Sequence, residues 1–179
     1  EQIMLISEAQ LTTWSHQGAV QASADTYNSI KSCIENVNWN SDLNYDIYLQ
    51  GSYKNSTNIR GNSDVDLVVE LRSTFYHNAN SLSEEEANEF NEFYGPGKYE
   101  LSSFKKVVLD ELSSHYGSNN VTEGNKSIKV KGSNGRLDAD VICCAQYREY
   151  KSFSRSNPQN YAEGITFWQK NDGSQIRNF

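Results

Sequence analysis

Residues 45–71 read YDIYLQGSYKNSTNIRGNSDVDLVVEL, and they contain the clearest structural pattern in the chain. Apolar residues alternate over 45–49, which predicts a short strand that ends at Gly51 and Ser52. A polar loop follows, and the apolar run after it predicts a second strand over about 64–71. The pattern is therefore strand, turn, loop and strand.

Two acidic residues lie on one face of the second predicted strand. Asp64 and Asp66 are two positions apart, so strand alternation projects both side chains the same way. Val65, Leu67 and Val69 then point to the other face. Two carboxylates on an otherwise buried strand are costly unless a cation pairs with them. Magnesium suits this place because it prefers carboxylate oxygens and keeps waters and phosphates as further ligands.

Gly51 and Ser52 have the chemistry of a phosphate-binding turn. Glycine lets the backbone approach a ligand closely. Backbone N–H groups beside a hydroxyl form a cradle for an anion. The order along the chain therefore predicts a phosphate site, then a loop, then a metal site.

A later stretch carries two more acids at strand spacing. Residues 136–143 read RLDADVIC, and the apolar run predicts a strand that includes Asp138 and Asp140. Both carboxylates share one face. Either could serve a metal, or both could be edge-strand acids that keep the sheet soluble.

These residues resemble those of a known superfamily. Gly51-Ser52, eleven intervening residues and the DVDL run that starts at Asp64 resemble the signature of the polymerase-β-like nucleotidyltransferases. The string LQGSYKNSTNIRGNSDVDLVV is similar to that of the CD-NTases. These are bacterial enzymes, similar to animal cyclic GMP–AMP synthase, that make cyclic oligonucleotide signals.

The later acids fit the same family. The run DADVICCAQYREY resembles the family's Asp-Val-Val-Pro-Cys sequence followed by an arginine. Asp140 matches the acid, Arg148 matches the arginine, and Cys143 stands where the family has proline. The resemblance implies that Asp140 is the third metal-binding acid, although Asp138 competes for that role.

The resemblance implies an α/β (α+β) fold with a polymerase-β-like nucleotidyltransferase core, a mixed twisted sheet and a long N-terminal helix. Residues 1–179 would then be one nucleotidyltransferase catalytic domain, the N-terminal part of a longer architecture. On this resemblance, the family's C-terminal helical half is expected to lie outside residues 1–179. A missing C-terminal segment or a second chain is therefore an expected partner.

The implied reaction is metal-dependent nucleotidyl transfer from nucleoside triphosphates, with a cyclic di- or trinucleotide second messenger for antiphage signalling as product. The expected cofactor is Mg²⁺, with Mn²⁺ as an alternative ion. The implied catalytic and metal-binding residues are Asp64, Asp66 and Asp140, and the implied nucleotide-binding residues are Gln50, Gly51 and Ser52.

Two other hypotheses use the same residues. The nucleotide could be transferred to another acceptor, such as a small molecule, a protein side chain or an RNA end. Alternatively, the chain could be a non-catalytic nucleotide-binding module. A purely structural role is disfavoured, because paired acids on buried strands have no structural rationale.

The bulk composition limits the partners. The net charge is −7, so nonspecific binding to nucleic acid, which needs clustered lysine and arginine, is not expected. Cys33, Cys143 and Cys144 show no metal-ligand spacing and are expected to be buried free thiols. No apolar run approaches the roughly 18–20 residues of a membrane span, so a cytoplasmic protein is expected.

The remaining segments contain helix and hairpin patterns. One long helix, or two in tandem with Gly18 as a weak point, is expected over 8–37. A long connection over 72–98 follows, with a capping box at Ser81 or Ser83, and then a helix that Ser102 or Ser103 caps and that ends near Gly117. The last predicted elements are a strand over 127–130, a turn over 132–135 and a hairpin over 164–176.

Overall fold

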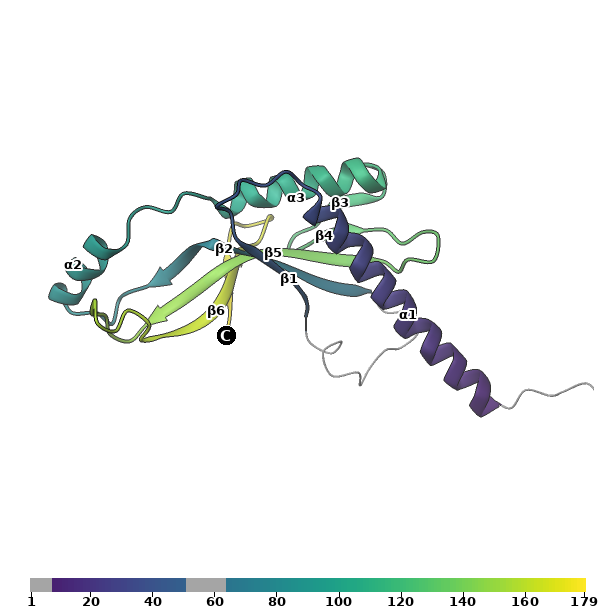
Figure 1. The fold of residues 1–179 in the computed structure, drawn as a ribbon, viewed down its shortest axis with the longest axis horizontal. Helices are drawn as coiled ribbons and strands as arrows, with labels where there is room; N and C mark the ends of the chain where they lie inside the picture. The colour runs from purple at the N-terminus through teal and green to yellow at the C-terminus, as the bar shows by residue number, and fades with distance from the viewer. Residues whose placement is uncertain (1–7, 51–63) are drawn as a thin grey trace, which may run out of the picture.

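A computed structural model describes residues 8–50 and 64–179 of the chain. Within these ranges it has three helices and a seven-stranded mixed sheet (Figure 1). The helices are α1 (Glu8–Glu35), α2 (Glu84–Phe93) and α3 (Leu101–Tyr116). The strands are β1 (Tyr45–Leu49), β2 (Val65–Asn78), β3 (Val121–Glu123), β4 (Ile128–Val130), β5 (Ala139–Tyr150), β6 (Tyr161–Trp168) and β7 (Gln175–Asn178).

The centre of the sheet is the long parallel pair of β2 and β5. The strand order is β1-β2-β5-β4-β3. On the side of β5 away from β2, β4 pairs with the first part of that strand, and β6 pairs with its second part and with β7. All pairings other than β2 with β5 are antiparallel. The mixed sheet and the long N-terminal helix agree with the predicted α/β class.

Helices α1 and α3 cover one face of this sheet. The alternate residues Val65, Leu67 and Val69 of β2 are fully buried, as is Val141 of β5. They form one core with residues of the two helices, including Ile30, Ile34, Phe104, Val108 and Leu112. Each such side chain contributes about 1.5–3 kcal/mol when buried. The apolar alternation seen in the sequence is therefore what attaches the helices to this face.

Helix α1 is one continuous element. Gly18 lies within the helix and is exposed to solvent, and the helix continues through it. The C-terminal part of the helix provides the core residues Ile30 and Ile34, whereas the N-terminal part extends past the sheet (Figure 1). Of the two predicted arrangements, the single helix is correct.

The prediction of a connection over 72–98 is wrong at its start, because β2 continues to Asn78. The pairing of β2 with β5 shifts register between Leu71 and Phe75. In this bulge the backbone N–H groups of Arg72 and Ser73 donate to the Asn44 carbonyl at 2.8 and 3.1 Å. The polar bulge interrupts the apolar alternation, so the sequence pattern ended the strand too early.

The predicted capping box is confirmed at Ser83, which caps α2. The Ser83 hydroxyl accepts from the Glu86 N–H at 3.2 Å, and the Glu86 carboxylate accepts from the Ser83 N–H at 2.8 Å. The predicted start of the next helix is wrong, because α3 has Glu100 as its N-cap, with no side-chain cap hydrogen bond. Its end is as predicted, since Gly117 has a φ of 89°.

The C-terminal predictions are also confirmed. β6 and β7 form the expected hairpin, and β4 falls within the strand predicted over 127–130. Asn134 and Gly135 have positive φ values of 52° and 86°, as a tight turn requires.

The three cysteines are free and buried, and burial raises the pKa of each thiol. None of the helices in the described ranges has the length and apolar character needed to cross a lipid bilayer.

Thr26 connects α1 to the segment that leads into β5. Its fully buried hydroxyl donates to the Ala22 carbonyl at 2.7 Å and accepts from the Leu137 N–H at 2.9 Å. We predict that Thr26→Val lowers the free energy of unfolding by about 1–3 kcal/mol, because it leaves the Leu137 N–H without its partner. Urea denaturation measures this, with the exposed strand residue Thr122→Val as a control that should change little. Equal stabilities of the two variants would contradict this account.

Candidate active site

The structure brings two of the predicted site residues together. Asp66 on β2 and Asp140 on β5 are register partners in the parallel pair. Neighbouring residues Val65, Leu67 and Val141 face the helix-covered core, so alternation turns both carboxylates to the other face. Adjacent strands lie about 4.8 Å apart, which places two acids within reach of one ligand.

Asp64 belongs to the same electrostatic environment. It is exposed and immediately precedes β2. The pKa of Asp66 is raised, first by burial and then by the negative charges of Asp140 and Asp64, while Lys129 opposes the shift. The raised pKa therefore reflects burial first and the neighbouring carboxylates second.

Asp140 has two polar partners that the sequence analysis missed. Its Oδ1 accepts a hydrogen bond from the Ser127 hydroxyl at 3.1 Å, and the Lys129 Nζ lies 3.3 Å from the same oxygen. A sequence pattern could have indicated Lys129, because it lies between the buried residues Ile128 and Val130 of a predicted strand. It must therefore face away from the core, but which strand it faces depends on long-range pairing.

The geometry separates Asp138 from Asp140. The Asp138 carboxylate is exposed and accepts a hydrogen bond from the Gly132 N–H at 2.6 Å, which closes the turn before β5. Its backbone carbonyl accepts from the Val65 N–H at 2.9 Å and so ties β5 to the start of β2. Asp138 therefore has a local structural role that Asp140 lacks.

Of the three predicted phosphate-binding residues, Gln50 lies within the part of the chain that the structure describes. Gln50 is exposed, and its backbone N–H donates to the Asp66 carbonyl at 3.0 Å. The chain therefore leaves β1 directly beside Asp66. Gly51 and Ser52 lie outside the described residues.

The donor chemistry at this place fits a hard divalent cation. Asp66 and Asp140 offer carboxylate oxygens on neighbouring strands, and carboxylates are preferred ligands of Mg²⁺ and Mn²⁺. As placed, however, no group of three His, Cys, Asp or Glu side chains within residues 8–50 and 64–179 could hold a metal ion.

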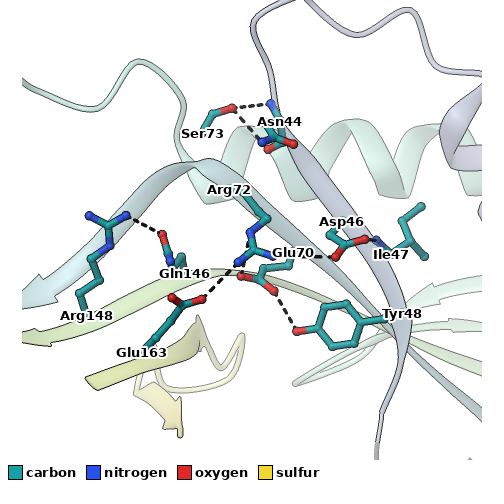
Figure 2. A network of polar contacts seen from close by, with 10 residues as sticks. All are labelled: Asn44, Asp46, Ile47, Tyr48, Glu70, Arg72, Ser73, Gln146, Arg148 and Glu163. Carbon is teal, nitrogen blue, oxygen red and sulfur yellow. Dashed lines mark hydrogen bonds and ion pairs between the residues drawn. The ribbon is translucent and has the colours of Figure 1, made fainter. Parts of the chain in front are cut away.

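A second polar cluster surrounds Arg72 (Figure 2). The Arg72 Nη2 donates to Glu163 Oε1 at 3.2 Å, and the guanidinium lies 3.8 Å from oxygens of both Asp46 and Glu70. The Tyr48 hydroxyl donates to Glu70 Oε2 at 3.0 Å. We refer to these five residues as the Arg72 cluster.

The Arg72 cluster joins three strands across the open face. Its members come from β1, β2 and β6, and they line a cavity of about 670 Å³. Glu70 lies four positions after Asp66 on the same strand, which puts both on one face. The cluster therefore fixes the surface beside the carboxylates, next to the bulge in β2.

A larger cavity of about 1350 Å³ lies beneath the connection from α2 to α3. It is lined in part by Tyr76, Cys143 and Phe167, which belong to or pack against the helix-covered core. None of the predicted site carboxylates lines it. The larger cavity is therefore not the place where the predicted chemistry would occur.

The comparisons with known proteins agree with this geometry. Residues 30–117 match the family model described as a nucleotidyltransferase domain. A cyclic UMP-AMP synthase of Rhodothermus marinus is 39% identical over 176 residues, which cover 98% of this chain and 58% of that protein. Cyclic nucleotide synthase CdnE01 of Staphylococcus haemolyticus is 38% identical over 181 residues, covering 98% of this chain and 59% of that protein.

A solved structure gives the same result. The Rhodothermus marinus CdnE c-UMP-AMP synthase, solved with Apcpp and Upnpp, superposes with a TM-score of 0.77 at 38% identity. The match covers 98% of this chain and 57% of that one.

The fold is thus that of a nucleotidyltransferase domain. Over 98% of its length the chain is similar to the CdnE cyclic nucleotide synthases, which agrees with the CD-NTase resemblance of its sequence motifs. It spans somewhat less than three fifths of the length of these relatives, 58% of the first and 59% of the second.

The buried acid of the Arg72 cluster predicts a pH effect on stability. Burial raises the pKa of Glu70 above its ordinary value of 4.5, against the opposing effects of Tyr48 and Arg72. The folded chain therefore keeps this proton at a pH where the unfolded chain has lost it. Glu70 then destabilises the fold progressively as the pH rises from about 4.5 through its folded pKa.

We predict that the free energy of unfolding of the wild type, minus that of Glu70→Gln, falls as the pH rises through this window and is constant above it. Urea denaturation at a series of pH values measures the difference. Tyr48→Phe removes a hydrogen bond that lowers the folded-state pKa of Glu70, so in that background the falling region should still begin near pH 4.5 and extend to higher pH. A difference that rises with pH would contradict the assignment.

Proposed function

We propose that residues 1–179 form the catalytic domain of a metal-dependent nucleotidyltransferase. Its substrates would be nucleoside triphosphates, and its product a cyclic di- or trinucleotide second messenger for antiphage signalling in the cytoplasm. The observation that carries the proposal is the pairing of Asp66 with Asp140 on neighbouring parallel strands, on the face of the sheet that α1 and α3 leave free.

The relatives support this proposal. The matching proteins from Rhodothermus marinus and Staphylococcus haemolyticus are named as cyclic nucleotide synthases. A CdnE cyclic dinucleotide synthase of Elizabethkingia meningoseptica, 28% identical to this chain, was solved with GTP and Apcpp. Nucleoside triphosphates are therefore the substrates we expect.

In the proposed reaction, a ribose hydroxyl oxygen forms a bond to the α-phosphorus of a nucleoside triphosphate. The bond from that phosphorus to the bridging oxygen breaks, pyrophosphate leaves, and the hydroxyl loses its proton. Mg²⁺ or Mn²⁺ would stabilise the charge that develops on the attacking and leaving oxygens.

The protein's own groups would bind and orient the substrate. Asp64 and Asp66 would hold the cation that accompanies the triphosphate, and Asp140 would hold the cation beside the attacking hydroxyl. Gly51 and Ser52 would present N–H groups and a hydroxyl to the phosphates. Gln50, whose backbone is bonded to Asp66, would fix the start of that turn.

We predict that nucleoside triphosphates stabilise the chain only when Mg²⁺ is present, and that Asp66→Asn abolishes this effect. A ligand at one hundred times its Kd adds about 2.7 kcal/mol to the free energy of unfolding. A thermal-shift panel of ATP, GTP, CTP and UTP, each with and without Mg²⁺, measures it. Asp140→Asn should behave like Asp66→Asn.

Asp138→Asn is the matched control, since it removes a nearby carboxylate that closes a turn. It should keep the metal-dependent shift. If Asp138→Asn lost the shift and Asp140→Asn kept it, the third acid would be misassigned. A shift that is indifferent to metal and to all three substitutions would favour a non-catalytic nucleotide-binding module.

A further inference from the structure

Lys129 lies among the carboxylates without being one of the predicted site residues. It is the register partner of Asp140 across the antiparallel pair of β4 and β5. Its ammonium is 3.3 Å from Asp140 Oδ1. Its charge also lowers the pKa of Asp66, so it lies near the second carboxylate as well. The Lys129 ammonium therefore lies beside Asp140 and near Asp66.

The contacts of Asp140 show what this cation does in the free protein. The Lys129 ammonium and the Ser127 hydroxyl both contact Oδ1 of Asp140. Ser127 is buried, whereas the side chain of Lys129 is 61% exposed. Ser127 is therefore a fixed partner, while Lys129 can leave at small cost because its long side chain carries a solvated head.

A divalent cation and an ammonium cannot share this oxygen without repulsion. Two positive charges a few ångströms apart disfavour each other even under partial solvent screening. Binding of a cation at Asp140 would therefore displace the Lys129 ammonium. The released ammonium would then be free to pair with the triphosphate held beside Asp64 and Asp66, because phosphate oxygens accept strong charge-assisted hydrogen bonds from lysine.

We propose that Lys129 is an exchangeable counter-ion of the carboxylates: it holds Asp140 while no metal is bound and transfers to the triphosphate when metal arrives. The inference rests on the proposed function, because it uses the same metal-binding acids. It makes Lys129 a positioning residue in the free protein and a phosphate-binding residue in the loaded one. It also explains why metal and nucleotide would bind together.

Removal of the lysine charge separates the two roles. Without nucleotide, Lys129→Met should bind Mn²⁺ about two- to fivefold more tightly than the wild type, since a competing ion pair is lost. With Mn²⁺ present, the same variant should bind Apcpp about two- to fivefold more weakly. Electron paramagnetic resonance of free Mn²⁺ measures the Mn²⁺ affinity, and calorimetry measures the Apcpp affinity.

Two further variants serve as controls for the charge change in Lys129→Met. Lys129→Arg keeps the charge and should stay close to the wild type in Mn²⁺ affinity. Lys106→Met removes another exposed lysine that pairs with an aspartate, Asp110 at 2.8 Å on α3, so it tests the change in net charge alone. It should leave both affinities unchanged. The difference between Lys129→Met and the wild type should shrink as salt is added.

The outcomes distinguish this inference from the proposed function. If the wild type binds Mn²⁺ through Asp66 and Lys129→Met binds it equally or more weakly, the counter-ion role is wrong while the metal site stands. If Lys129→Met binds Mn²⁺ more tightly but does not bind Apcpp more weakly, Lys129 does not transfer to the phosphates. If Mn²⁺ binds to neither protein, or binds equally to Asp66→Asn, both the metal site and the inference fail.

Discussion

The repulsion between carboxylates on neighbouring strands is the constraint on which this structure depends. Asp66 and Asp140 are held side by side by the parallel register of β2 and β5. Such a pair is stable only if the strands cannot separate and if positive charge is supplied. Burial raises the pKa of Asp66, the charges of Asp140 and Asp64 raise it further, and Lys129 opposes them in part.

The two faces of the sheet meet these two requirements separately. One face is apolar, and its burial against α1 and α3 prevents β2 and β5 from separating. The other face carries the acids, Lys129 and the Arg72 cluster, whose guanidinium joins β1, β2 and β6 (Figure 2). A single strand alternation thus produces both the stable core and the charged surface, which is why the site can be held rigidly in a small domain.

The sequence predicted the features that depend on local pattern. Alternation gave β1, the start of β2 and the shared face of Asp66 with its neighbours, and the motif spacing gave the family. It failed where tertiary contacts override local pattern. The bulge at Arg72 hid the second half of β2. Helix α3 begins at Leu101, whose N–H donates to the Tyr76 hydroxyl at 3.4 Å, so its N-cap lies two or three residues before the serines expected to cap it. The position of Lys129 could not be predicted, because it depends on the pairing of β4 with β5.

The most direct test of this account is a crystal structure of the chain with Mn²⁺ and Apcpp, with the metal located by its anomalous scattering. The account predicts an anomalous peak between the Asp66 and Asp140 carboxylates, on the face opposite α1 and α3, with the phosphates directed toward Ser52. A metal peak elsewhere, or a nucleotide bound in the cavity beneath the connection from α2 to α3, would contradict it.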